Sequence, residues 1–232
     1  MYNCELLSSA RNQNKSLESA TSVENNVKSL AIAPLTASLI PAAVALDQHC
    51  LGGMWSADGY QREVESPNSV MLAAFDPTLL SSSLSPSSSP LLALACLWTI
   101  LDEAHITILA VHPDCQGQGL GYFMVTALMQ AAWQREMEWV TLEVRVSNQA
   151  AIALYRQFDF TDVGNRKRYY QNPDEDALIL WRKGLKQSEF SGRLHMWWSQ
   201  AGDRLHRAGW RALSTPAQTD DLAFPLDIRI FS

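Results

Sequence analysis

The chain has 232 residues, of which 47% are hydrophobic and 18% charged, so it can bury one sizeable core and has the composition of a soluble globular protein. Its formal net charge of -6 argues against broad electrostatic affinity for nucleic acid or anionic lipid. The four cysteines have no CxxC or zinc-ligand spacing, and the first residues lack the charge and apolar pattern of a secretory signal, which together predict a reduced, cytoplasmic protein.

The first part of the chain predicts an arm, four elements and a loop. Residues 1–27 are rich in Ser and Asn and predict a disordered N-terminal arm. The elements expected next are a strand, two helices and a second strand, at residues 28–35, 37–46, 57–64 and 69–75. Residues 76–90 hold so many Ser and Pro residues that they predict a mobile surface loop.

Two apolar runs, Leu91–Ile100 and Ala104–Val111, are separated by a short turn and predict an antiparallel hairpin. A second turn leads into a helix expected from Gly119 to Arg135. Apolar residues at helical spacing give this helix one buried stripe, formed by Leu120, Phe123, Met124, Ala127 and Ala131.

The next strand is expected at residues 140–146, where Val and Leu alternate with polar residues. A helix follows over residues 148–158, with Asn148 as its cap. Two further strands are expected near residues 161–170 and 177–181, with the Asn172-Pro173 turn between them.

This order of elements indicates a single α/β (α+β) domain over residues 28–185, with a mixed central sheet flanked by helices. Residues 186–232 form a C-terminal extension in which aromatic residues and leucines are interleaved with Arg and His. One interpretation is an amphipathic helix on a membrane surface or on a partner. The favoured interpretation is a helix that packs its Trp side chains back on the domain.

The turn Gln116–Gly121 (QGQGLG) joins a strand to an amphipathic helix. Glycines allow positive φ angles and close approach of the backbone to a ligand. Free N–H groups and the helix dipole favour an anion at such a helix start. The Gly-Lys-Ser/Thr of a P-loop is absent, and the final glycine spacing does not fit a dinucleotide fingerprint. By itself the turn predicts only an anion or a tight bend.

The pattern Gln/Arg-x-x-Gly-x-Gly/Ala is met by Gln116, Gly119 and Gly121. With the segments LAVHPDCQGQGLG, LEVRVSNQAAIALY and RKRYYQNPDEDALIL, the chain resembles the GNAT superfamily of N-acetyltransferases, and more closely its ribosomal-protein-alanine (RimI-type) members. With a weaker match at Leu51–Trp55, the resemblance covers residues 28–185 and neither tail.

The resemblance implies acetyl-CoA as co-substrate and no metal. It assigns the cofactor to Leu109, Ala110, Val111, Gln116, Gly117, Gln118, Gly119, Leu120, Gly121, Tyr122 and Asn148. At the strand end the backbone would hold the pantetheine arm, and the N–H of Val111 would polarise the thioester carbonyl. Gly117 and Tyr122 stand where relatives often have basic residues, so phosphate binding would depend more on backbone amides. Asp159 stands where relatives usually have Gly.

Two residues are candidates for proton transfer. The resemblance makes Glu143, in the middle of its strand beside the cofactor helix, the proton acceptor, and Tyr155 the proton donor to the leaving thiolate. Without the resemblance, Glu143 would be interpreted as a sheet-surface residue paired with Arg145 or a neighbour, and Tyr155 as a core aromatic.

Other residues near the predicted site carry less information. Tyr169 and Tyr170 precede the turn where relatives shape the peptide entrance, so they are candidates for substrate contact or for sheet packing. His105 and His112 are interpreted as structural. Cys115 has no His/Asp partners that would make it a nucleophile.

The function that the sequence predicts is N-terminal α-amino acetylation of a protein, with an N-terminal Ala of a small-subunit ribosomal protein as the substrate implied by the resemblance. Acetylation of Lys side chains or small amines, and a non-catalytic acetyl-CoA-binding module, remain as alternatives. Direct nucleic-acid binding is not expected, and membrane contact by the extension is the weaker alternative.

Overall fold

The computed structural model describes residues 28–80 and 91–212. In these ranges the strands form one sheet with the order β6-β7-β5-β4-β3-β2-β1-β8. The strands are β1 (Lys28–Pro34), β2 (Ser69–Phe75), β3 (Leu91–Ile100), β4 (Glu103–Val111), β5 (Trp139–Arg145), β6 (Thr161–Gln171), β7 (Asp174–Lys183) and β8 (Trp210–Ala212). The helices are α1 (Ile40–Leu51), α2 (Ala57–Glu65), α3 (Pro77–Leu80), α4 (Leu120–Gln134), α5 (Gln149–Arg156) and α6 (Phe190–Arg207), with 3-10 turns η1 (Ala37–Leu39) and η2 (Pro113–Cys115).

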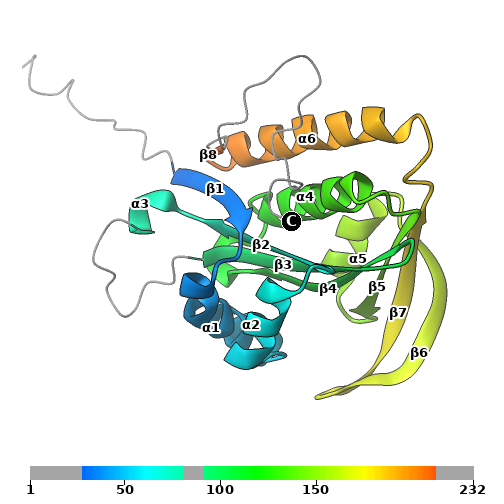
Figure 1. Ribbon diagram of the computed structural model, residues 1–232, viewed down its shortest axis with the longest axis horizontal. Coiled ribbons are helices and arrows are strands. Elements are labelled where there is room, and N and C mark those ends of the chain that lie inside the picture. Colours follow the sequence, from blue (N-terminus) through cyan, green and yellow to red (C-terminus); the bar gives the residue numbers. More distant parts are fainter. Residues whose placement is uncertain (1–27, 81–90, 213–232) are drawn as a thin grey trace, which may run out of the picture.

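The sheet separates two apolar clusters, and helices cover both of its faces (Figure 1). One cluster lies between the sheet, α4, α5 and α6, and the other lies between the sheet, α1 and α2. β2, an interior strand between β3 and β1, is therefore buried over nearly its whole length and has a nearly continuous apolar sequence, SVMLAAF. The mixed α/β fold expected from the order of elements is confirmed.

α4 is buried on nearly all sides, because α6 lies across its outer face (Figure 1). The expected stripe is buried, but so are side chains on the opposite side of the helix, including Tyr122, Val125 and Gln130. The Trp198 indole N–H donates to Gln130 Oε1 at 2.6 Å. The prediction of a single buried stripe was therefore too narrow, since a helix from the far end of the chain provides a second layer.

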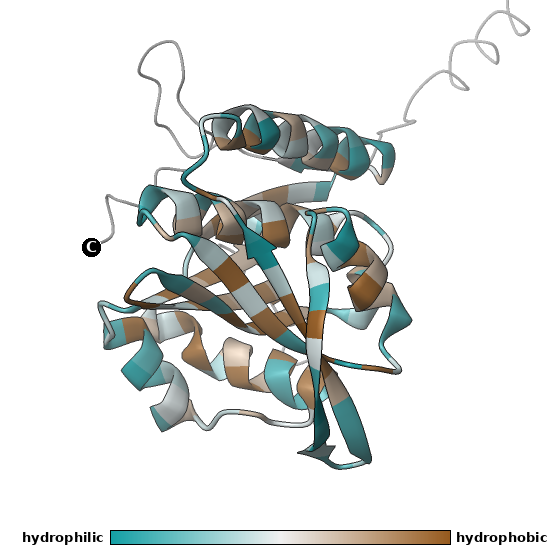
Figure 2. Ribbon diagram, turned by 90° about the vertical axis from the view of Figure 1, so that its right-hand side faces the viewer, coloured by the Kyte–Doolittle hydropathy of each residue, from teal (hydrophilic) through white to brown (hydrophobic). Residues whose placement is uncertain are grey.

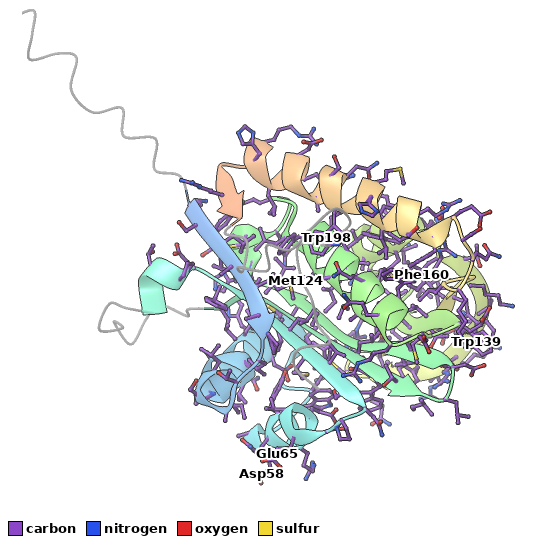
Figure 3. The ribbon with its side chains drawn as sticks, turned by 45° about the horizontal axis from the view of Figure 1, so that its top comes forward. Asp58, Glu65, Met124, Trp139, Phe160 and Trp198 are labelled. Carbon is purple, nitrogen blue, oxygen red and sulfur yellow. The ribbon has the colours of Figure 1, made fainter. Side chains whose placement is uncertain are left out.

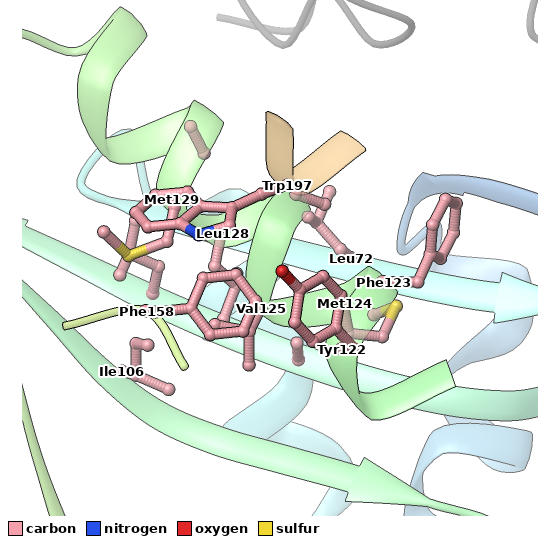
Figure 4. Packing of buried hydrophobic residues seen from close by; sticks show 14 of the residues in the cluster. Leu72, Ile106, Tyr122, Phe123, Met124, Val125, Leu128, Met129, Phe158 and Trp197 are labelled. Atoms are coloured by element: carbon pink, nitrogen blue, oxygen red, sulfur yellow. The ribbon is translucent and has the colours of Figure 1, made fainter. Parts of the chain in front are cut away.

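The C-terminal extension packs on the domain through an apolar face of α6. Trp197 is 1% exposed and its ring centroid lies 4.9 Å from that of Phe158. Figure 4 shows Trp197 above Phe158 and beside Val125 and Leu128 of α4. The outer side of α6 is largely hydrophilic (Figure 2). Of the two interpretations of the extension, the structure shows the one in which the helix packs its Trp side chain on the domain.

After α6 the chain returns to the sheet. β8 pairs in parallel with the first residues of β1, with Lys28 opposite Trp210, and the Lys28 ammonium lies 5.0 Å from the centroid of the Trp210 ring. This strand has only three residues, and no sequence pattern predicted it. The described part of the extension thus adds both a helix and an edge strand to the domain.

Two expected boundaries need correction. The helix predicted at residues 37–46 begins as the 3-10 turn η1 and continues as α1 to Leu51, where Gly52 has a φ of 78°. The loop predicted at residues 76–90 is wrong at its start, because α3 forms at Pro77–Leu80 with Asp76 Oδ1 accepting the N–H of Thr78. The rest of that loop, the predicted N-terminal arm and residues 213–232 lie outside the described residues.

β4 and β5 are parallel neighbours that separate along their length. Their pairing covers Glu103–Ile106 on β4 and Trp139–Leu142 on β5. The register between β3 and β4 shifts at the same level, between Ile106 and Ile108, which makes Thr107 a bulge. A bulge bends its strand and increases the local twist. The carboxyl ends of β4 and β5 therefore diverge beyond Ile106 and Leu142, and ligands in open α/β sheets bind at such an edge.

Candidate functional site

The glycine-rich turn lies between β4 and α4. Gly117 has a φ of 71° and Gly119, the residue that caps α4, has a φ of 92°. Residues with a side chain rarely adopt this left-handed backbone conformation, so the turn itself requires glycine at these two positions. The first N–H groups of α4 have no partners one turn earlier and, with the helix dipole, favour an anion at this end. The expected strand–turn–helix geometry is confirmed.

The extension contacts this turn at several points. Trp210 donates its indole N–H to Gln118 Oε1 at 3.0 Å, and the Tyr122 hydroxyl donates to Gln200 Oε1 at 2.6 Å. The Arg204 guanidinium lies 4.2 Å from the centroid of the Tyr122 ring. Tyr122, at a position where the resemblance expects a phosphate contact, is 3% exposed and points toward α6.

The end of β4 presents backbone groups to the side where β5 diverges. The N–H of His112 donates to the carbonyl of Leu92 on β3 at 2.8 Å. Alternate N–H groups of a strand point in opposite directions, so those of Val111 and Leu109 point away from β3 and toward the β5 side. The Val111 carbonyl accepts from Gln116 Nε2 at 3.1 Å, which ties the strand end to the turn.

Glu143 lies on β5 at the first position beyond the pairing with β4. Val140, Leu142 and Val144 belong to the cluster under α4, so the side chain of Glu143 lies on the opposite face of the sheet. Glu143 thus lies opposite the Val and Leu residues, as the alternation predicts, and its carboxylate faces away from the cofactor helix instead of lying beside it. The alternation of the strand is confirmed.

The Glu143 side chain is 6% exposed and has two nitrogen-bearing neighbours, His105 and Arg166. Its Oε2 lies 3.0 Å from His105 Nε2, and its Oε1 lies 3.1 Å from a guanidinium nitrogen of Arg166 on β6. The hydrogen bond and charge of His105, together with the charge of Arg166, outweigh burial and lower the pKa of Glu143 below its usual value. Glu143 is therefore held as a carboxylate, the form that can accept a proton.

Two further side chains continue from His105 along the same face. His105 Nδ1 lies 2.9 Å from Thr141 Oγ1, and the Thr141 hydroxyl donates to Glu103 Oε1 at 2.7 Å. The sequence identified none of these contacts, because they depend on the register between β4 and β5, in which His105 stands opposite Thr141. The pattern of polar residues at alternate positions on both strands is the one signal that could have found them.

Tyr155 lies on α5 and belongs to the cluster under α4. It is 6% exposed, and its ring meets that of Phe160 edge-on with centroids 5.7 Å apart. Burial, with a smaller contribution from Tyr170, raises the pKa of the Tyr155 hydroxyl above its usual value. This side chain is therefore held protonated, as a proton donor must be. It lies on the face of the sheet opposite to that of the Glu143 side chain.

Tyr169 and Tyr170 differ in their surroundings. The Tyr170 hydroxyl donates to the backbone carbonyl of Glu143 at 3.3 Å, while the Arg145 guanidinium lies 4.0 Å from the centroid of its ring. Burial and the neighbouring Tyr169 raise the pKa of Tyr170 to about 12. Tyr169 is 45% exposed. The structure thus brings Tyr170 to the candidate base and leaves Tyr169 at the surface.

Asn148 caps α5 as expected, because its Oδ1 accepts the N–H of Ala151 at 3.1 Å. Asn148 lies three residues after the end of β5. Cys115 is buried, and burial raises the pKa of its thiol, which disfavours the nucleophilic thiolate. His112 Nδ1 accepts the N–H of Asp114 at 3.3 Å and so helps to shape the turn.

Within residues 28–80 and 91–212, no group of three or more His, Cys, Asp and Glu side chains is arranged to hold a metal ion. Over the same ranges, no helix is both long enough and apolar enough to cross a membrane.

Known proteins resemble this chain in sequence over part of its length. The acetyltransferase (GNAT) family matches residues 46–160. Over 90 residues, 38% of the chain, the sequence is 42% identical to the [ribosomal protein bS18]-alanine N-acetyltransferase of Escherichia coli (strain K12), covering 61% of that protein. Over 93 residues, 39% of the chain, it is 40% identical to the enzyme of the same name from Haemophilus ducreyi, covering 64% of it. The chain thus spans less than two thirds of the length of the curated relatives it matches.

The fold is similar to solved structures over a longer range. The crystal structure of the ribosomal-protein-S18-alanine N-acetyltransferase from Escherichia coli superposes with a TM-score of 0.56 at 29% identity, covering 66% of this chain and 93% of that one. The structure of Ard1 from Thermoplasma volcanium, at 19% identity and a TM-score of 0.56, covers 67% of this chain and 97% of that one and supports the fold alone. The family match, the sequence relatives and the diverging β4–β5 pair beside a glycine-rich turn agree: the chain belongs to the GNAT family of acetyltransferases.

Proposed function

We propose that this chain transfers an acetyl group from acetyl-CoA to the N-terminal α-amine of a protein, with the N-terminal Ala of a small-subunit ribosomal protein as its substrate. The single observation that carries the proposal is the position of the Glu143 carboxylate, at the first residue where β5 leaves β4. The names of the Escherichia coli and Haemophilus ducreyi relatives support the choice of substrate.

The cofactor would lie across the diverging strand ends and the turn. We assign its pyrophosphate to the backbone of Gln116–Tyr122 and its pantetheine arm to the backbone of Leu109–Val111, with Asn148 on the other side. The N–H of Val111, which points toward the β5 side, would donate to the thioester carbonyl and stabilise the negative charge that develops there.

Glu143 would remove the proton from the attacking amine. An N-terminal α-amine has a pKa of about 7.7–8.0, so roughly a tenth or more of it is neutral at pH 7, whereas the amine of Lys, near 10.4, is almost fully charged. A carboxylate held ionised by His105 and Arg166 is a base of modest strength, and it suits the α-amine better than the Lys amine.

Tyr155 would return a proton to the leaving thiolate. In water a tyrosine near pKa 10 is a weaker acid than a thiol near 8.5, so the transfer would be uphill. Burial raises the pKa of both groups when both are in the same dry site, which keeps them comparable. Tyr170, bonded to the Glu143 carbonyl, and the exposed Tyr169 would contact the substrate peptide.

The direct test is an acetylation assay with acetyl-CoA and peptides that begin with Ala. The matched control carries the same sequence with a blocked N-terminus and an internal Lys. We expect acetylation of the free N-terminus alone. Acetylation of the blocked peptide alone would identify a lysine acetyltransferase, and binding of acetyl-CoA without transfer to any amine would identify a binding module.

A further inference from the structure

A line of four side chains crosses β4 and β5 on the face of the sheet away from α4. It runs from Glu143, which is 6% exposed, through His105 and Thr141 to Glu103, which is 40% exposed. The three contacts measure 3.0, 2.9 and 2.7 Å in that order. The line therefore connects the candidate base with the solvent.

The chemistry of the groups fixes the direction of two of these hydrogen bonds. A carboxylate only accepts, so the single hydroxyl proton of Thr141 is donated to Glu103. The Thr141 oxygen must then accept the proton on His105 Nδ1. Once Nδ1 carries that proton, a neutral His105 would present the lone pair of Nε2 to the Glu143 carboxylate at 3.0 Å. Two acceptors at this distance require a proton between them.

We propose, on the basis of the acetyl transfer proposed above, that His105 and Glu143 accept the proton of the attacking amine as one unit. The N–H bond of the amine breaks and an O–H bond forms on the Glu143 carboxylate. That O–H bond then breaks as an N–H bond forms on His105 Nε2. The resulting imidazolium and carboxylate hold one proton between them, which is the state that the 3.0 Å contact requires, and this proton must pass to water before the next amine attacks. One proton moves from substrate to solvent, and no other reactant is needed.

Thr141 and Glu103 have a positioning role in this unit. They hold the proton of His105 on Nδ1, so that Nε2 is the nitrogen that faces Glu143. The Glu103 Oε1 atom also lies 3.9 Å from Nδ1 itself. Glu103 is itself held by the Trp139 indole N–H, 3.4 Å from its Oε2.

The other charged or titratable groups around Glu143 come from β6. Arg166 lies 3.1 Å from Oε1, and the Tyr170 hydroxyl donates to the backbone carbonyl. The guanidinium of Arg166 favours the ionised form of Glu143 and so moves the shared proton toward His105. The lowered pKa of Glu143 agrees with that distribution.

The test compares the wild type with His105→Gln and Thr141→Val, with His206→Gln on the exposed side of α6 as the matched control. The measured quantity is kcat/KM for the Ala peptide from pH 6 to 9.5. In the wild type, log(kcat/KM) should rise steeply at low pH, because both the peptide amine and the His105–Glu143 unit must lose a proton.

We expect His105→Gln to lower the plateau by about 100-fold and to leave a single ionisation, that of the amine. Thr141→Val should show a smaller loss in the same direction, and His206→Gln should match the wild type. Acetyl-CoA affinity should be unchanged in all three variants, and far-UV circular dichroism should show that each of them is folded. The proposal is overturned if His105→Gln keeps the plateau and the pH profile of the wild type. If His105→Gln does not fold, the plateau of kcat/KM in Thr141→Val decides, and a wild-type value there would overturn the proposal.

A second measurement is independent of turnover. Imidazole ¹⁵N NMR of the wild type should show His105 protonated at Nδ1 on both sides of its titration, with Nε2 gaining the shared proton at low pH. A neutral His105 protonated at Nε2 would overturn the proposal even if the enzyme is active. A wild type that acetylates no peptide contradicts the proposed function, whereas an active enzyme indifferent to His105→Gln contradicts only this inference.

Discussion

Gly119, at the start of α4, lies directly against Arg204 of α6: a Cβ added to Gly119 would be 3.0 Å from the Cβ of Arg204. From Val111 to Gln134 the chain contains no Lys or Arg. The guanidinium of Arg204, over the Tyr122 ring and 2.7 Å from Gln157 Oε1, therefore brings a positive charge to a turn that has none of its own.

We expect Arg204→Gln to weaken acetyl-CoA binding about 5-fold, because a cation beside a partly exposed anion contributes roughly 1 kcal/mol. The matched control is Arg207→Gln, on the exposed side of the same helix. Calorimetric titration at two salt concentrations measures the effect, which should shrink at the higher one. Equal affinities of the two variants would mean that the positive charge of Arg204 does not act on the cofactor.

Glu143→Gln removes the candidate base and keeps the shape of the side chain. We expect kcat to fall about 100-fold, while acetyl-CoA affinity stays the same because the carboxylate faces away from α4 and the turn. Glu65→Gln, at the distant end of α2 in Figure 3, provides the control. A parallel loss of acetyl-CoA binding would instead indicate a structural role.

Tyr155→Phe removes one hydroxyl from a buried side chain and preserves its ring packing against Phe160. We expect kcat to fall at least 10-fold, since the leaving thiolate loses its proton donor. The melting temperature should change little because the ring remains. Steady-state kinetics and thermal unfolding measured together check both points, and an unchanged kcat would remove Tyr155 from the mechanism.

The stability of the protein should depend on Glu143 at low pH. Its pKa in the folded state lies below the usual 4.5, so it contributes stability above the unfolded pKa and loses it as the pH falls through the folded value. We expect the difference in unfolding free energy between the wild type and Glu143→Gln to shrink below pH 4.5. Urea unfolding from pH 7 to 3 measures it, and a difference that grows toward pH 3 would contradict the sign.

Trp197→Ala should destabilise the protein by about 3–5 kcal/mol, because it empties a fully buried site between α6, α4 and Phe158. Met196→Ala, at the neighbouring position, is the control, since Met196 is 45% exposed. Chemical unfolding of both variants provides the comparison. If both variants lose a similar and small amount of unfolding free energy, α6 contributes little to the stability of the domain.

Local patterns predicted most of the fold. The alternation in β5, the glycine turn before α4 and the Asn148 cap depend on neighbours in sequence, and each is found as expected. These features are set by strand and helix periodicity and by backbone conformation, which a short segment specifies by itself.

The contacts that define the candidate base could not be predicted in the same way. The contact between His105 and Glu143 depends on the β4–β5 register and on the bulge at Thr107. The alternation of residues along a single strand specifies neither of these. The second layer over α4 depends on α6, more than fifty residues later in the chain. Such features follow from long-range packing, so sequence periodicity favoured a structural interpretation of His105 and an exposed side for α4.

The parallel pairing of β1 with β8 joins the first strand of the described chain to its last. A ribosome makes the chain from its N-terminus, so β1 emerges early and has an uncovered edge until residues 210–212 have been synthesised. Contacts between such distant segments form late and slow the completion of a fold. The nascent domain therefore completes its sheet only when residues 210–212 have left the ribosome, so the edge of the first described strand is covered by the last part of the described chain to be made.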